Sequence, residues 1–258
     1  MKDKINRKLK RDRENVFYKI FKRHFQETDH QESKMKAYKV ISTIIVATII
    51  LTGCKVTVST EVSLKDILYG ETRTITGDLH VEVAGCSSHE DSRKPSASIQ
   101  KAQQTIPSIF ADAEYLECFS QGFKSFAHFK VPFFLDKDKD GKLASEKHIN
   151  ILSNKDTLLW VGIPTAIKEN LERARSNSYG SNALDLSINI KVNNDTGKDF
   201  PFAVVASYVD GKPYVFGNLT STKGKGPFVV TLSDVSVSDA LENGVAMVLN
   251  WDFPEVEQ

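Results

Sequence analysis

Three aspartates alternate with lysines in the segment Asp136-Lys-Asp138-Lys-Asp140-Gly141. Carboxylate oxygens at alternate positions, with a glycine at the sixth for a sharp turn, are what a calcium-binding loop requires. The pattern fails at the twelfth position, where Lys147 replaces the bidentate glutamate, and the preceding residues read as a strand. Asp136, Asp138 and Asp140 are therefore a weak calcium candidate, and the alternative, an acidic Asp-Gly turn without an ion, is favoured.

Histidines could supply proton transfer or metal binding, but their spacing matches no local motif. The segment after Cys54 contains four of them: His80, His89, His128 and His148. No pair has the His-Glu-x-x-His spacing of a zinc enzyme, and no Gly-x-Ser-x-Gly nucleophile elbow or phosphate-binding glycine loop occurs. A catalytic set assembled from distant residues stays open, because its members need not be close in the chain. A pocket with His128 or His148 beside an acid and a serine would indicate a hydrolase.

A third chemical candidate is the thiol of Cys54, because of what precedes it. Met35-Lys-Ala-Tyr-Lys39 is short and basic, residues 40–51 are apolar apart from three hydroxyl side chains, and Thr52-Gly53-Cys54 follows at once. Basic, apolar and small residues in this order are typical of a secretory signal. The apolar run is shorter than the roughly 20 residues that a membrane span needs.

The segment Leu51-Thr52-Gly53-Cys54 resembles the lipobox of bacterial lipoproteins. The resemblance implies that diacylglycerol is attached to the Cys54 thiol, that the chain is cut between Gly53 and Cys54, and that the new amino group is acylated. Several acyl chains are needed because a single one anchors a protein only marginally. Beyond this covalent lipid no cofactor is expected. The alternative is a buried apolar helix with a chance cysteine.

The stretch from Met35 to Cys54 and its continuation Lys55-Val56-Thr57-Val58 is similar to uncharacterised enterobacterial prophage lipoproteins of the YafY/YfjS kind. This resemblance implies an envelope lipoprotein of unassigned activity at the inner membrane, facing the periplasm. Lys55 indicates the outer membrane instead, because bacterial lipoproteins use an acidic residue after the lipidated cysteine as a retention signal. The choice between the two membranes stays open.

Residues 1–34 are dense in charge and contain four aromatic side chains among the basic ones. One interpretation is a cytoplasmic, basic amphipathic helix that touches anionic lipid. The other, which we favour, is an over-long start, because Met35 by itself begins a signal peptide (residues 35–53) of normal size. In both cases the stretch is absent from the mature protein.

Lipidation of Cys54 would leave Cys86 and Cys118, an even number, in an exported chain. An oxidising compartment permits disulfides, so the count predicts a Cys86–Cys118 bridge. Closing a loop of this size would stabilise the fold by about 3–4 kcal/mol in the chain-entropy model. The alternative is two buried thiols that never meet.

Charge is distributed unevenly along the chain. Residues 1–53 have a net charge of +7, whereas residues 54–258 have a net charge of −6. A nucleic-acid-binding protein needs its basic excess on the folded part. The pattern therefore argues against a nucleic-acid partner and leaves the membrane, through the lipid, and another envelope protein.

The elements that would position these residues fall into two regions with different patterns. Residues 54–182 mix alternating segments with helical spacing, including strands at 56–62, 73–83, 124–135 and 157–163 and helices at 63–68, 98–119 and 164–175. Residues 183–258 are β-rich, with alternation from Leu184 to Val192 and the hairpin signal Asp210-Gly211. We expect an α+β fold whose C-terminal part is an antiparallel sheet or small sandwich. The linker near 176–182 is short, so an arrangement of the two regions as one continuous domain stays open.

Together these features predict a lipid-anchored envelope protein whose folded part binds another envelope component and is not an enzyme. The basis is the Cys54 signal combined with the absence of a local catalytic motif. Two alternatives from other classes stay open. One is a periplasmic hydrolase with a spatially assembled site, and the other is weak calcium binding through Asp136, Asp138 and Asp140.

Overall fold

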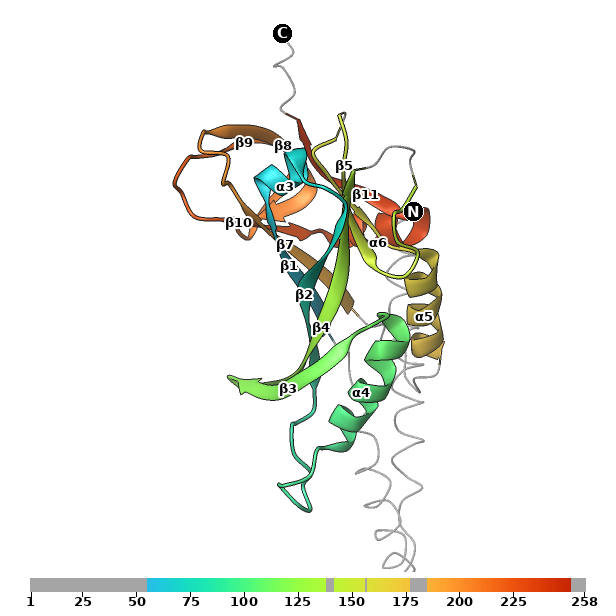
Figure 1. Cartoon of the computed structure of the whole chain (residues 1–258). Helices are drawn as coiled ribbons and strands as arrows, with labels where there is room; N and C mark the ends of the chain where they lie inside the picture. The colour runs from blue at the N-terminus through green and yellow to red at the C-terminus, as the bar shows by residue number, and fades with distance from the viewer. Residues whose placement is uncertain (1–54, 138–141, 156, 177–184, 252–258) are drawn as a thin grey trace, which may run out of the picture. The chain divides into compact units, whose positions relative to one another are not determined.

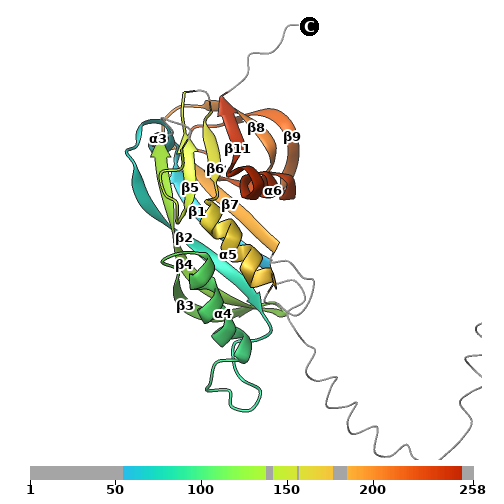
Figure 2. The same ribbon diagram turned by 90° about the vertical axis from the view of Figure 1, so that its right-hand side faces the viewer.

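Nine strands close into a mixed β-barrel in the computed structural model of the chain, which describes residues 55–137, 142–155, 157–176 and 185–251 (Figures 1 and 2). In chain order the strands are β1 (Lys55–Ser63), β2 (Arg73–Val83), β3 (Glu114–Gln121), β4 (Lys124–Lys137), β5 (Ile149–Ser153), β6 (Leu159–Gly162), β7 (Asp185–Asn193), β8 (Phe200–Val209), β9 (Lys212–Ser221), β10 (Phe228–Leu232) and β11 (Val245–Trp251). The helices are α3 (Leu64–Tyr69), α4 (Ala97–Ile109), α5 (Thr165–Ser176) and α6 (Asp234–Asn243). None of the helices within these ranges is long and apolar enough to cross a membrane.

The ring of the barrel runs β10-β7-β1-β2-β4-β5-β6-β11-β8 and closes because β10 also pairs with β8. Two pairings are parallel, β1 with β7 and β4 with β5, and the others are antiparallel. Strands β3 and β9 lie outside the ring, where β3 extends the sheet from β4 and β9 pairs with β8. The protein is therefore mostly β.

The expected α+β fold with a separate C-terminal sheet or sandwich is wrong. β7, the first strand of the supposed C-terminal region, lies beside β1 over its whole length, from Lys55 opposite Asp185 to Ser63 opposite Asn193. The late strands therefore complete the same barrel as the early ones. Alternation predicts that a segment is a strand but carries no information about which distant strand it pairs with.

Most individual elements lie where the pattern predicts them, and the hairpin at Asp210-Gly211 joins β8 to β9. The helix expected over 98–119 ends at Ile109, and residues from Glu114 onward form β3 against β4. Tertiary pairing overrides helical spacing here because the edge of β4 is available to residues 114–121. Strand β5 and helix α6 were not predicted.

The barrel interior is filled by the alternate apolar residues of the ring strands, of which Phe129 and Phe133 of β4 are the largest that are fully buried. Gly77 faces the same interior. A Cβ at this position would lie 2.3 Å from Cε2 of Phe133 and 2.5 Å from the carbonyl oxygen of Ser59. Gly77 does not interrupt β2, which pairs with β4 without a register shift from Arg73 to Val83. Glycine therefore provides space for a phenylalanine ring at this position.

Helix α4 covers one face of the sheet formed by β2, β3 and β4 where that sheet extends beyond the ring (Figures 1 and 2). Its side chains Ile99, Ala102, Ile106 and Ile109 are buried in the core. Ser96 caps the helix, because its hydroxyl accepts a hydrogen bond from the backbone N–H of Ile99. The opposite face of the three strands remains open to solvent, and it carries most of the polar side chains considered below.

Candidate functional site

A cluster of ionisable and aromatic side chains lies on the open face of β2, β3 and β4. We call it the histidine face, and it comprises Asp78, His80, Glu117, Phe119, Phe126, His128 and Lys130. Strand alternation places these side chains opposite the buried ones. The register of β2 with β4 sets Asp78 opposite Lys130 and His80 opposite His128. A register shift in β3 between Tyr115 and Glu117 brings Glu117 opposite His128.

Asp78 is the centre of the polar contacts on the histidine face. Its Oδ1 atom accepts hydrogen bonds from Nε2 of His128 at 2.6 Å and from Nζ of Lys130 at 2.7 Å. The other ring nitrogen of His128, Nδ1, lies 3.8 Å from Oε1 of Glu117. His128 therefore lies between two carboxylates, and its side chain is only 15% exposed, whereas that of Glu117 is 66% exposed.

Aromatic contacts surround this polar group. The rings of His80 and His128 stack with centroids 4.6 Å apart and planes 22° apart. The ring of Phe119 meets His80 edge-on at 5.6 Å and stacks on Phe126 at 5.6 Å. The imidazoles are thus held between the ion pair on one side and the phenylalanine pair on the other.

The electrostatics of the face follow from these contacts. Burial lowers the pKa of His80 below its ordinary value of 6.5, and the charge of His128 lowers it further. Burial alone would raise the pKa of Asp78, but hydrogen bonds from Lys130 and His128 outweigh it, so the pKa lies below 3.8. Asp78 is therefore an anion over the whole physiological range, with two cationic or polar donors committed to one of its oxygens.

The chemistry available on the histidine face follows from its open position on the sheet. Among the described residues no group of three or more metal-ligating side chains is placed to hold an ion. The face is an open sheet surface that offers an exposed carboxylate at Glu117, an ammonium at Lys130 and flat aromatic rings. Aromatic side chains are enriched at contact surfaces between proteins, whose rims are polar.

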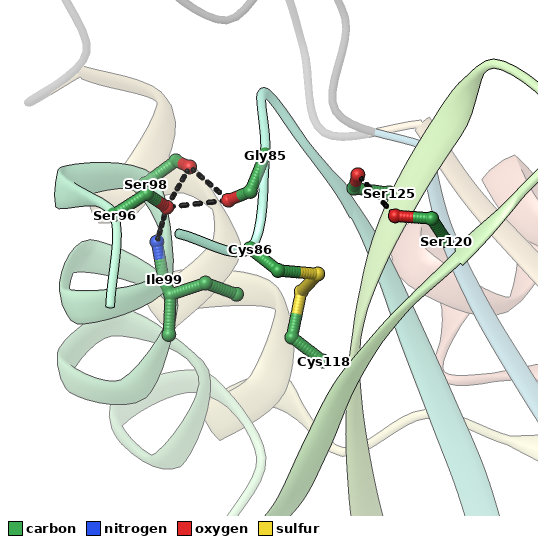
Figure 3. The surroundings of a disulfide bond; sticks show 8 residues. All are labelled: Gly85, Cys86, Ser96, Ser98, Ile99, Cys118, Ser120 and Ser125. Carbon is green, nitrogen blue, oxygen red and sulfur yellow. Dashed lines mark hydrogen bonds between the residues drawn. A yellow bond between two sulfur atoms is a disulfide. The ribbon is translucent and has the colours of Figure 1, made fainter. Parts of the chain in front are cut away.

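The structure contains the Cys86–Cys118 disulfide that the cysteine count predicts, with the two Cα atoms 5.6 Å apart (Figure 3). Cys118 lies in β3 on the side opposite the histidine face, and Cys86 lies in the connection between β2 and α4. The hydroxyl of Ser96 donates to the carbonyl of Gly85 at 2.5 Å, which closes the same connection (Figure 3). The bridge therefore fastens β3 to the segment that leads into α4.

Ser145, His148 and Asp112 lie in a row, which is the combination that would indicate a hydrolase. Nδ1 of His148 is 3.0 Å from Oγ of Ser145, and Nε2 is 3.0 Å from Oδ2 of Asp112. However, the same hydroxyl oxygen accepts hydrogen bonds from the backbone N–H groups of Lys147 and His148. The side chain of Asp112 is 77% exposed, whereas the acid of a Ser-His-Asp triad is buried.

The hollow beside His148 is lined by Phe110, Val131, Pro132 and Ile149 among others and has a volume of about 10 Å³. That is room for one water molecule and not for an ester or amide substrate. Ser145, His148 and Asp112 therefore stabilise the turn ahead of β5. His128, the other histidine named for a hydrolase, has two carboxylates near it but lies on the open sheet.

Two other predicted sites fall partly or wholly outside the described residues. Asp136 lies near the end of β4, where its Oδ1 atom accepts a hydrogen bond from the hydroxyl of Thr72. Asp138 and Asp140 lie outside the described residues, as do Gly53 and Cys54, so the calcium and lipidation predictions stay predictions. Lys55, the neighbour of Cys54, is the first residue of β1.

Sequence reasoning did not predict that Asp78, His80, Glu117, His128 and Lys130 form one cluster. A signal was present, because the polar residues of both alternating segments share one parity: 78, 80 and 82 in one, and 128 and 130 in the other. The sequence does not indicate the pairing of β2 with β4 or the addition of β3, most of which falls within the helix expected over 98–119.

The fold and this surface define a closed, mixed β-barrel domain with a disulfide-fastened sheet extension and an exposed ionic and aromatic face. The chain belongs to the family described as Domain of unknown function (DUF7424), whose model matches residues 56–255. No curated protein and no solved structure matches the chain.

Proposed function

We propose that this protein is a lipid-anchored component of the bacterial envelope and that it acts by binding another envelope component through the histidine face. The observation that carries the proposal is the position of Cys54 immediately ahead of the first barrel strand, which begins at Lys55. Cleavage between Gly53 and Cys54 would therefore remove the leader and leave every strand that the structure describes. The family region likewise begins at residue 56.

The disulfide supports the proposed compartment. Disulfides persist in the periplasm and at cell surfaces and are rare in the reducing cytosol. The Cys86–Cys118 bridge joins two segments of the barrel's sheet extension. A chain exported by a leader that ends at Gly53 would meet the oxidising conditions that this bridge needs.

The histidine face supports a binding role. Besides its charges and rings, it ends at β3, which among the described strands pairs only with β4. The other edge of β3 is therefore open for a partner strand, and Leu116, at the register shift, is 44% exposed. A partner would meet both an open backbone edge and the side chains of Glu117 and Phe119.

The anchor is tested by the substitution Cys54→Ala, followed by labelling of cells with radioactive palmitate. We expect the variant to remain an uncleaved precursor without label. The double variant Cys86→Ala/Cys118→Ala is the matched control, because it also removes thiols but leaves Cys54 to be labelled. Label on the Cys54→Ala chain would refute the lipid anchor. Fractionation of labelled wild-type membranes decides between inner membrane and, as Lys55 suggests, outer membrane.

The binding surface is tested by a photo-crosslinking amino acid at Glu117, on the histidine face, and at Thr220, an exposed position of β9. In intact envelopes we expect a discrete protein adduct from position 117 and not from position 220. The substitution Asp78→Lys on the same face should diminish the adduct, because it reverses the charge that orders His128 and Lys130. Equal crosslinking from both positions, or no effect of Asp78→Lys, would count against this surface.

A further inference from the structure

The start of β1 shows which end of the barrel would face the lipid. Cys54 is one peptide unit, about 3.8 Å, from Lys55, the first residue of β1. If Cys54 carries acyl chains, as the proposed function states and on which this inference rests, no linker separates the barrel from the bilayer. The side chains at this end must then lie at the membrane surface.

The register of the strands identifies what else lies at this end. Val56 of β1 is opposite Val81 of β2, and Val83, at the end of β2, is opposite Ser125 of β4. Ser125 is next to the β3–β4 turn, because Gln121 at the end of β3 pairs with Lys124 at the start of β4. At about 4.8 Å per strand, β4 lies roughly 10 Å from β1. Figures 1 and 2 both show the tip of β3 and the start of β1 toward the same end of the barrel.

The tip of this hairpin is Gly122-Phe123. Gly122 adopts a φ of 60°, which suits glycine, and it allows the two-residue turn to project the next side chain outward. Phe123 has a relative exposure of 110%, so its ring touches almost nothing within the described part of the chain. A fully exposed phenylalanine on a tight turn is unfavourable in water and has no role in the core.

The base of the hairpin is held by contacts on both of its strands. Nζ of Lys124 forms an ion pair with Oε2 of Glu82 at 2.8 Å, and the hydroxyls of Ser120 and Ser125 are 3.0 Å apart. The disulfide at Cys118 fastens β3 three residues before its end. These contacts hold the backbone on both sides of the tip, so less conformational freedom is lost there when the tip meets a surface.

We propose that Phe123 inserts its ring into the interfacial layer of the bilayer that holds the acyl chains of Cys54. Large apolar side chains are favourable in this layer, and a cation such as Lys124 beside them lies among the lipid headgroups. Acyl chains alone let a barrel rotate about its attachment point. A second contact, about two strand spacings away, fixes its tilt and directs β3 and the histidine face along the membrane.

The experiment compares two tryptophan variants of the mature, lipidated protein in phosphatidylcholine vesicles whose acyl chains are brominated near the headgroup. Phe123→Trp places the reporter at the hairpin tip. Val215→Trp is the matched control, because Val215 is 89% exposed on β9, toward the other end of the barrel. The native Trp160 and Trp251 give both variants the same background. We expect bromine quenching and a blue shift for Phe123→Trp beyond the wild-type signal and none for Val215→Trp.

The outcomes separate this inference from the anchor on which it rests. Palmitate label in the preparation with no extra quenching of Phe123→Trp overturns the membrane contact of the tip and leaves the anchor intact. Equal quenching of both variants also overturns it, because the barrel would then have no fixed orientation. A mature preparation without label on Cys54 overturns both proposals.

Discussion

The two strands outside the barrel ring, β3 and β9, are held in different ways. β3 is fastened by the Cys86–Cys118 disulfide, and its Tyr115 and Cys118 side chains pack against the core beside α4. β9 is held by its hairpin with β8 and by Tyr214 and Leu219, which also contact the core. In Figures 1 and 2 the two strands lie toward opposite ends of the barrel.

The surfaces of the two strands differ accordingly. β3 contributes Glu117 and Phe119 to the histidine face, where side chains are ordered by ion pairs and ring contacts. β9 exposes Val215, and its hairpin partner β8 exposes Tyr208. The covalent bond therefore lies on the covered side of β3, beside α4, and fastens the strand whose other face is open. This reinforcement also lies at the end that we assign to the membrane.

Removing the disulfide should have the largest effect on this comparison. For Cys86→Ser/Cys118→Ser we expect a loss of about 3–4 kcal/mol in the free energy of unfolding, because the unfolded chain regains the entropy of the open loop. Urea unfolding measures the loss, and hydrogen exchange should show the β3 amides exchanging as fast as those of β9. A loss below about 1 kcal/mol, or unchanged exchange in β3, would show that pairing with β4 and packing against α4 hold this strand without the bridge.

A smaller effect is expected from Gly77→Ala, which tests the packing of the barrel interior on the other side of β2 from the histidine face. The added methyl group would meet the ring of Phe133 and the backbone of β1, so we expect a loss of about 1–3 kcal/mol. Gly226→Ala, on the connection between β9 and β10, is the matched control, because its Cβ would meet nothing within 4 Å. Thermal unfolding of both variants measures the difference. Equal stability of the two variants would contradict this prediction, because it would mean that β1, β2 and β4 shift to accommodate the methyl group at little cost.

The sequence predicts the strands of this protein better than their partners. Alternation located β1, β2, β4 and β7 almost to the residue, because each has one buried and one exposed face. It did not reveal that β1 and β7, which are 130 residues apart, pair in parallel from Lys55 and Asp185 onward. Closure of the barrel depends on the pairing of β1 with β7 and of β8 with β10. The alternation of apolar and polar residues in these strands is compatible with many other strand partners.

The candidate site divides along the same line. The Cys86–Cys118 bridge was predictable because only two cysteines remain after Cys54. The contact of Asp78 with His128 was not, since it joins residues 50 positions apart across a strand pair. β3 was concealed because Ala113 and Leu116 continue the helical spacing of α4, although they lie beyond its end at Ile109.

The smallest expected effect concerns the pH dependence of stability that the histidine face contributes and that β9, with no histidine, lacks. The pKa of His80 in the folded chain lies below 6.5, so between that lowered value and 6.5 the unfolded chain binds a proton that the folded chain does not. Stability from His80 is therefore present above 6.5 and is lost as the pH falls through this window. Asp78 also has a lowered pKa, but its contribution is lost only below 3.8.

His80→Gln should flatten the stability profile between about pH 8 and about pH 5, the range in which histidine titrates. Asp78, His128 and Lys130 are unchanged in this variant, so only the contribution of His80 is removed. Urea midpoints measured across the range for wild type and variant give the slope of each profile. If the two slopes agree, burial of His80 does not change its titration on folding, contrary to this prediction. The stacked imidazoles would then not make the stability of the sheet extension depend on pH.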